Sequence, residues 1–188
     1  MKKVKDKTRR IVRAKATLAV IDIQERLLPA IFEGARVVQN TVRLIKGARA
    51  LGIPVLVTEQ YKKGLGATTP AVAAEIEGLT HLEKVAFSAC GAAGFNEALK
   101  AKKVADVILC GIEAHVCVSQ TCLDLLDNGF RVFVVADAIS SRTAENARIG
   151  IERMRDAGAV IVSAEMVLFE LLKAAGTDEF KQILTLVK

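Results

Sequence analysis

The sequence predicts a single α/β domain: a three-layer, doubly wound fold with a mostly parallel six-stranded sheet and helices on both faces. Short runs rich in Val, Ile and Leu alternate along the chain with longer stretches of helical periodicity. The strand-like runs have few polar residues at their centres, as in strands that are buried on both faces of a parallel sheet. A length of 188 residues supports one core rather than two.

Six runs are expected to form strands, and right-handed crossovers between them place helices on both faces of the sheet. These runs are residues 17–23, 53–59, 79–87, 104–111, 130–137 and 159–165.

Six further stretches are expected to be helical: residues 35–50, 94–101, 115–128, 143–157, 164–174 and 178–187. The first places Val38, Val42, Ile45 and Arg49 at helical spacing. Thr143 is a suitable N-cap for the fourth, because its hydroxyl can accept a hydrogen bond from the first turn.

Composition and charge exclude several classes of protein. A hydrophobic share of 52% and a charged share of 26% are typical of a globular chain rather than a disordered one. No apolar stretch approaches the roughly 20 residues of a membrane span, and the basic N-terminus lacks the apolar segment of a secretory signal. We therefore expect a cytoplasmic protein with reduced cysteines and no membrane partner.

The formal net charge of +6 is concentrated at one end, since residues 1–16 hold eight Lys or Arg and one Asp. The remainder is close to neutral, and aromatic residues make up 4%, so the domain is not expected to bind nucleic acid. We expect residues 1–10 to form a flexible basic arm and residues 11–188 to form the folded domain. Contact between the arm and an anionic partner is the alternative.

The candidate functional residues follow the strand runs, because ligands of doubly wound sheets bind at the carboxyl ends of the strands. Asp22 follows the first run and can accept a proton, or it can cap the next turn. Lys84 stands near the end of the third run, where a buried ammonium needs a partner; the alternative is an outward side chain that reaches water.

Cys117 follows the fourth run, in a strand–turn–helix arrangement that is typical of nucleophiles. Free N–H groups at the start of a helix stabilise a thiolate and can also hold an oxyanion. The alternative is a buried, inert cysteine. Cys110, His115 and Cys122 lie nearby, but their spacing does not match a zinc site, and no metal or other cofactor is expected.

Other polar residues are assigned structural roles or left open. Asp137, after the fifth run, is expected to support its neighbours, and His81 is expected to find a local partner. Gly64 and Gly66 do not match a phosphate-binding pattern, so nucleotide binding is not predicted. Tyr61, the one tyrosine of the chain, could border a pocket or pack in its loop.

Taken together, five segments resemble the isochorismatase-like cysteine hydrolases from about residue 11 to the end. They are VIDIQERL, TEQYKKGLGAT, EKVAFSACG, LCGIEAHVCVSQTCLDLLDNGF and VADAISSR. The combination of TEQY-x-x-GLG with GIEAHVC is specific, and the most similar subgroup is the isochorismatase domain-containing proteins.

The resemblance implies a catalytic triad of Asp22, Lys84 and Cys117. It also implies a cis peptide at Ile112–Glu113, with the N–H groups of Glu113 and Cys117 forming an oxyanion hole. A substrate pocket and a homo-oligomer are further expectations. The expected pocket residues are Gln24, Leu27, Gln60, Tyr61, Phe87 and His115.

The function so implied is metal-independent hydrolysis of an amide or related C–N bond in a small molecule, through a cysteine thioester. A non-catalytic binding or scaffold protein with the same fold is the alternative. Departures from better-known members narrow the activity. Residues 59–61 replace the metal-binding set of nicotinamidases, and Leu27 replaces an aromatic residue. Cys117 is present where true isochorismatases lack cysteine. Lys62 stands where the subgroup usually has Pro.

Overall fold

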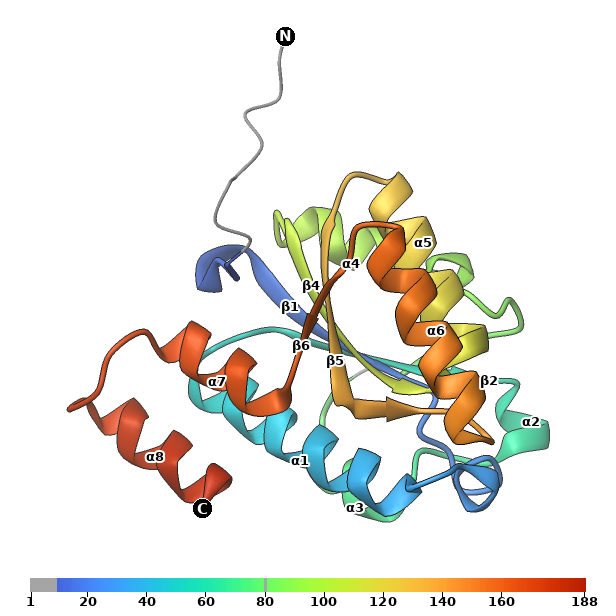
Figure 1. Ribbon diagram of the computed structural model, residues 1–188, viewed down its shortest axis with the longest axis horizontal. Helices are drawn as coiled ribbons and strands as arrows, with labels where there is room; N and C mark the ends of the chain where they lie inside the picture. Colours follow the sequence, from blue (N-terminus) through green and yellow to red (C-terminus); the bar gives the residue numbers. More distant parts are fainter. Residues whose placement is uncertain (1–9, 80) are drawn as a thin grey trace, which may run out of the picture.

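The computed structural model describes residues 10–79 and 81–188. Within them six strands form one sheet of order β3-β2-β1-β4-β5-β6, and every neighbouring pair is parallel (Figure 1). The strands are β1 Ala16–Ile21, β2 Val55–Gln60, β3 His81–Lys84, β4 Asp106–Ile112, β5 Arg131–Ser140 and β6 Val160–Val162. The predicted fold class is confirmed, and the sheet is fully rather than mostly parallel.

The third strand is shorter than predicted, because the chain turns back directly after Lys84. The carbonyl oxygens of Ala86 and Phe87 accept hydrogen bonds from the Lys84 ammonium, at 3.3 and 2.8 Å. Val85 is 80% exposed and Phe87 54% exposed. The apolar residues of this run after Lys84 therefore belong to a surface loop and not to a strand.

Eight α-helices surround the sheet in the described part of the chain. They are α1 Gly34–Ala50, α2 Lys62–Leu65, α3 Pro70–Ala73, α4 Phe95–Ala101, α5 Ser119–Asp127, α6 Ala144–Asp156, α7 Ala164–Leu172 and α8 Asp178–Val187. A π-helical turn, η4 (Ala114–Val118), precedes α5, and short 3-10 turns cover Arg13–Lys15, Leu28–Ala30 and Ala89–Gly91. The helices α2 and α3 were not expected, since four residues are too few to show a period.

Of two predicted helix details, the N-cap at Thr143 is confirmed and the buried face of α1 is partly wrong. The Thr143 N-cap is confirmed, because its hydroxyl accepts a hydrogen bond from the Asn146 N–H at 3.1 Å. The predicted stripe of α1 is wrong at Arg49, which is exposed and donates to the carbonyl of Glu75. The buried face lies largely one position earlier, at Val37, Thr41, Leu44, Ile45 and Ala48.

Two hydrophobic cores cover the two faces of the sheet. Residues of α1, α3, α7 and α8 form the first core, and residues of α4, α5 and α6 form the second (Figure 1). Successive residues of β1 alternate between them, with Leu18 and Val20 in the first and Ala19 and Ile21 in the second. The central strand is therefore buried on both sides, as its unbroken apolar run predicts.

The order of the strands places a topological switch point between β1 and β4. From β1 the sheet grows through β2 to β3 on one side, and from β4 through β5 to β6 on the other. Such a point is where doubly wound folds bind ligands. Asp22 follows β1 and Glu113 follows β4, so both lie at this edge of the sheet.

The expected basic arm, residues 1–10, lies outside the described residues except for Arg10, which is exposed. In residues 10–79 and 81–188, no helix has the length and apolarity needed to cross a membrane.

Candidate active site

A buried ion pair joins Asp22 to Lys84 at the switch point. Both side chains have no exposed surface, and the Lys84 Nζ lies 2.6 Å from Asp22 Oδ2. The second carboxylate oxygen, Oδ1, accepts a hydrogen bond of 2.7 Å from the Thr58 hydroxyl. Asp22 is therefore not a helix cap and Lys84 does not reach water: the structure brings them together as partners.

Lys84 is held by oxygen atoms on all sides. Besides Asp22, its ammonium donates to Gln60 Oε1 at 2.6 Å and to the carbonyl oxygens of Phe87 and Ala86. A lysine ammonium has three N–H groups, so these four acceptors leave none free for a substrate. Lys84 can act through its charge on neighbouring atoms, while its direct donors are already engaged.

Cys117 lies next to this pair, within η4, and is 5% exposed. Burial raises the pKa of the Cys117 thiol to about 12; the Asp22 charge adds to this rise and the Lys84 charge opposes it. A hydrogen bond between Asp22 and the thiol, and the charge of Glu113, raise the pKa further. The resting group is thus a thiol beside a carboxylate, rather than the thiolate at a helix N-terminus that the sequence pattern indicates.

The turn before Cys117 has an unusual backbone. The Ile112–Glu113 peptide bond is cis, and Gly111 has φ +119°. A Cβ atom at Gly111 would collide with the carbonyl oxygen of Ile21, so glycine lets β4 approach the end of β1 closely. Among the described residues none accepts a hydrogen bond from the Glu113 N–H, which leaves that donor available to a ligand.

The Glu113 side chain points to a cation at the rim of this turn. Its Oε1 accepts a hydrogen bond of 2.8 Å from Arg142 Nε, and the Arg142 side chain is 60% exposed. Because Glu113 is paired, the charges beside Cys117 cancel in two pairs, Asp22 with Lys84 and Glu113 with Arg142.

Two predicted pocket residues have a different task from the one expected. The Gln24 amide is fully buried, accepts from the Gln60 N–H, and donates to the carbonyls of Gln60 and Gly66. It therefore ties a loop to the end of β2. Leu27 is half-buried and packs against the core on the α1 side.

Three other residues predicted for the pocket, Gln60, Tyr61 and His115, have different surroundings. Gln60 donates from Nε2 to the Val85 carbonyl while its Oε1 holds Lys84, so its amide is engaged on both sides. Tyr61 is 55% exposed and borders a cavity of about 460 Å³. The other residues that line this cavity are Lys62, Lys63, Glu83, Lys84, Val85, Ala86, Gly91 and Ala93. The His115 ring is bonded through Nδ1 to the Ser141 hydroxyl at 2.9 Å.

A second buried carboxylate, Glu59, lies beside the site. Burial would raise its pKa, but hydrogen bonds from Lys62, from the N–H and hydroxyl of Thr68, and from His81 lower it to about 2. The Lys62 Nζ lies 2.9 Å from Glu59 Oε2, a contact that the Pro usual in the subgroup could not make. Glu59 and Gln24 thus hold the loop 61–68 from two sides, and His81 has the local partner expected for it.

The cysteines do not assemble a metal site. Cys110 belongs to the core on one face of the sheet, whereas Cys117 and Cys122 belong to the other. Asp137 has the expected supporting role, since it accepts a hydrogen bond from the first N–H of α7 at 2.8 Å. In residues 10–79 and 81–188, no three His, Cys, Asp or Glu side chains are grouped so that they could hold a metal ion.

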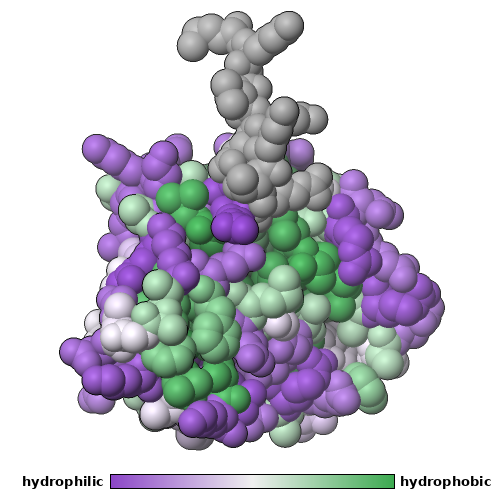
Figure 2. All heavy atoms as spheres, turned by 60° about the vertical axis from the view of Figure 1, so that its left-hand side comes forward, coloured by the Kyte–Doolittle hydropathy of each residue, from purple (hydrophilic) through white to green (hydrophobic). Residues whose placement is uncertain are grey.

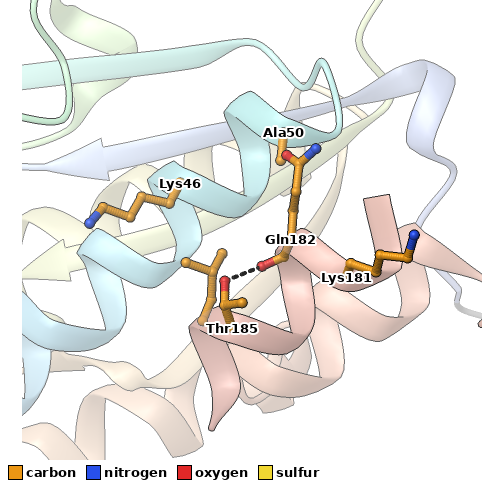
Figure 3. A pocket seen from close by; sticks show the side chains of 6 residues that line it. Lys46, Ala50, Lys181, Gln182 and Thr185 are labelled. Carbon is orange, nitrogen blue, oxygen red and sulfur yellow. Dashed lines mark hydrogen bonds between the residues drawn. The ribbon is translucent and has the colours of Figure 1, made fainter. Parts of the chain in front are cut away.

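Other hollows of the surface lie away from these residues. A hollow of about 390 Å³ is lined by residues of α1 and α8, and its two lysines extend away from each other (Figure 3). Both lysines are paired with carboxylates, Lys46 with Glu75 and Lys181 with Asp178. A wider hollow adjoins α7 and residues 10–12. Figure 2 turns the α7–α8 side forward and shows apolar surface interrupted by hydrophilic side chains.

Two polar groups of the site, on Thr58 and Ser141, are not among the residues predicted from the sequence. Thr58 is the hydroxyl partner of Asp22, and its signal is a threonine at the end of an otherwise apolar run. Ser141 holds His115, and its signal is the pair of serines at 140 and 141, shortly after the fifth run.

Comparison with known proteins gives a consistent result. Residues 16–166 match the isochorismatase domain model. The isochorismatase domain-containing protein 2 of Danio rerio is 39% identical over 168 residues, 89% of this chain and 84% of the relative. A secreted isochorismatase effector, Isc1, of Phytophthora sojae is 38% identical over 183 residues, 95% of this chain and 87% of the relative.

Solved structures share the fold. The MAR1 ribonuclease of Caenorhabditis elegans superposes with a TM-score of 0.90 at 39% identity, covering 95% of this chain and 92% of that one. The YcaC protein of Escherichia coli, described as an octameric hydrolase of unknown specificity, gives 0.88 at 25% identity, covering 94% and 88%.

Proposed function

The chain belongs to the isochorismatase family, and from this premise we propose that it is a cysteine hydrolase that cleaves an amide or related C–N bond in a small molecule. One observation carries the proposal: a buried Asp22–Lys84 ion pair adjoins the buried thiol of Cys117 at the switch point of the sheet. A protein that only binds or scaffolds has no need of three such groups in contact, since each is costly to bury without function.

In the first half of the reaction Asp22 takes the proton of the Cys117 thiol as sulfur attacks the substrate carbonyl. The charge moves from the carboxylate to sulfur and then to the carbonyl oxygen, and Lys84 stays nearby as a fixed positive charge. The N–H groups of Glu113 and Cys117 would hold the oxyanion. As the tetrahedral intermediate collapses, the C–N bond breaks and the nitrogen takes the proton from Asp22, leaving ammonia or an amine and a thioester.

In the second half water attacks the thioester while Asp22 takes its proton. The C–S bond breaks, the thiol regains the proton, and a carboxylic acid leaves. Each step moves one proton between Cys117, Asp22 and the reacting atoms, so the residues named are sufficient for the chemistry.

The surroundings favour a small substrate without a strong net charge. Cys117 is 5% exposed, the Lys84 donors are engaged, and both charge pairs at the site are balanced. Tyr61 and Phe87 offer exposed aromatic surface at the edge of this region. Small primary amides are therefore the first class to test.

We further propose that the protein forms a homo-oligomer. The octameric relative from Escherichia coli supports a homo-oligomer. We also propose a cytoplasmic location, in contrast to the Phytophthora relative, which is named a secreted effector.

A ribonuclease is a second candidate function, favoured by the name of the Caenorhabditis relative and by the basic charge of this chain. That charge gathers in residues 1–16, whereas Cys117 is nearly enclosed. RNA cleavage by the wild type that is lost in Cys117→Ala would support this candidate.

The deciding experiment is a screen of small amides for ammonia release, with the wild type, Cys117→Ala and Asp22→Asn side by side. We expect turnover by the wild type alone. Intact-protein mass spectrometry under substrate should show an acyl group on Cys117. Turnover that survives in Cys117→Ala would refute Cys117 as the nucleophile. A screen that detects no ammonia release, together with RNA cleavage by the wild type, would favour the ribonuclease.

A further inference from the structure

The helix α6 packs on the catalytic turn through a glycine. A Cβ atom at Gly150 would lie 2.8 Å from the oxygen and 2.9 Å from the carbon of the Ala114 carbonyl, and 3.1 Å from the His115 nitrogen. These atoms form the Ala114–His115 peptide group, and Ala114 lies three residues before Cys117. Helix backbone therefore meets turn backbone with no room for a methyl group.

The conformation of Gly150 gives no other reason for glycine. Its φ is not among the positive values found elsewhere in the chain, and it lies well inside α6. Glycine is the least favourable residue in a helix interior after proline, so Ala would suit the helix itself better. What requires glycine here is the close approach to the turn.

A second contact from the same part of the chain holds the turn. The Ser141 hydroxyl is fully buried, accepts a hydrogen bond from the His115 N–H at 3.3 Å, and pairs with the His115 ring at 2.9 Å. On the other side of the turn, Gly111 lies against the Ile21 carbonyl, one residue before Asp22. The spacing between Asp22 and Cys117 thus depends on contacts at both sides.

We propose that Gly150 is a positioning residue for the catalytic turn, with Ser141 as its second support; this rests on the function proposed above. A methyl group at position 150 displaces the Ala114 peptide or the helix, because the atoms it meets are backbone and cannot rotate away. The displacement moves the Glu113 and Cys117 N–H groups relative to Asp22. Neither Gly150 nor Ser141 needs to touch the substrate.

The test compares Gly150→Ala, Ser141→Ala and a matched control, Gly47→Ala, in the full-length protein. Gly47 is also a buried glycine inside a helix, α1, and a Cβ there meets the end of the Leu168 side chain, which can move. The readout is the iodoacetamide alkylation rate of Cys117 at neutral pH, with Cys90 as an internal reference, followed by mass spectrometry. Thermal unfolding is measured alongside.

We expect Gly150→Ala to lower the alkylation rate of Cys117 roughly tenfold or more while the rate of Cys90 is unchanged. Small misplacements of reacting groups have large effects on rate. Ser141→Ala should slow Cys117 in the same direction, and Gly47→Ala should leave it at the wild-type rate whatever its melting temperature. A folded Gly150→Ala with the wild-type Cys117 rate would overturn the proposal.

If Gly150→Ala does not fold, Ser141→Ala decides: a slower Cys117 supports the proposal and an unchanged rate overturns it. A wild-type Cys117 that reacts no faster than Cys90 is a separate outcome. It would refute the nucleophile itself, and this inference with it.

Discussion

Replacing Lys84 with Met tests the buried ion pair, because it removes the charge and keeps an unbranched side chain. The variant leaves the Asp22 carboxylate fully buried, with Thr58 as its remaining side-chain hydrogen-bond donor besides the Cys117 thiol. Breaking a buried pair at one partner costs about 3–5 kcal/mol. For a chain of this size each kcal/mol lowers the melting temperature by about 2–4 °C, so we expect a fall of roughly 6–20 °C.

The reciprocal variant, Asp22→Asn, should cost less, since Lys84 keeps three oxygen acceptors, from Gln60, Phe87 and Ala86. The double variant Asp22→Asn/Lys84→Met should lose less free energy of unfolding than the sum of the two single losses, because no unpaired charge remains. Thermal and urea unfolding at one fixed protein concentration measure all three. If Lys84→Met costs under about 1 kcal/mol, or if Asp22→Asn costs more than Lys84→Met, our view of this pair is wrong.

Three further predictions follow from the buried polar groups. Glu59 has a folded pKa of about 2 against 4.5 unfolded, so its stabilisation is full above pH 4.5 and lost as pH falls toward 2; Glu59→Gln should abolish this part of the acid transition in urea titrations. Cys110 and Cys122 have folded pKa values of about 12 against 9 unfolded. Stability should thus hold below pH 9 and fall above it by about 1.4 kcal/mol per pH unit per cysteine, with a shallower slope in Cys122→Ala. Thr58→Val removes a hydrogen bond to Asp22 and should cost about 1–3 kcal/mol in urea unfolding, whereas an unchanged midpoint would show that the bond contributes nothing.

The fold was predictable because its signals are local and repeated. Each central strand is an apolar run, each long helix has a period and an end signal, and the parallel order follows from their alternation. The third strand was predicted too long, since its apolar residues Val85 and Phe87 belong to a surface loop that folds back on Lys84. An apolar residue in the sequence does not distinguish a buried strand from a loop whose carbonyl oxygens accept hydrogen bonds from a neighbouring side chain.

The site was predictable as a set of candidates rather than as a geometry. Without the family resemblance, Asp22 could equally be a helix cap. The β1–β2 register pairs Ile21 with Thr58, whose hydroxyl bonds to Asp22, and the same carboxylate pairs with Lys84. Gln24 is expected in the pocket from the family resemblance, and in the structure its amide binds backbone groups of Gln60 and Gly66. The direction of a side chain after a strand depends on the turn, and no sequence period encodes it.

Burial also reversed one electrostatic expectation. Free N–H groups near Cys117 suggested a stabilised thiolate, but burial and the Asp22 charge raise the thiol pKa to about 12. The proposed chemistry therefore depends on transfer of the proton during attack, and not on a thiolate at rest.

That difference makes the rate of cysteine alkylation at pH 7 the most direct test of the central claim. Cys90, Cys110, Cys117 and Cys122 all have raised pKa values, of about 11 for Cys90 and about 12 for the others. Unaided, all four should be slow at pH 7, and the half-buried Cys90 should react first.

With Asp22 as base, Cys117 should instead be the cysteine that reacts fastest with iodoacetamide at pH 7. Peptide mass spectrometry measures the extent of alkylation at each cysteine. Asp22→Asn should change the Cys117 rate strongly, because the variant removes the base and leaves the Lys84 charge unpaired beside the thiol. If Cys90 reacts first in the wild type and the Cys117 rate is the same in Asp22→Asn, then Asp22 does not activate Cys117 and the proposed hydrolase mechanism is contradicted.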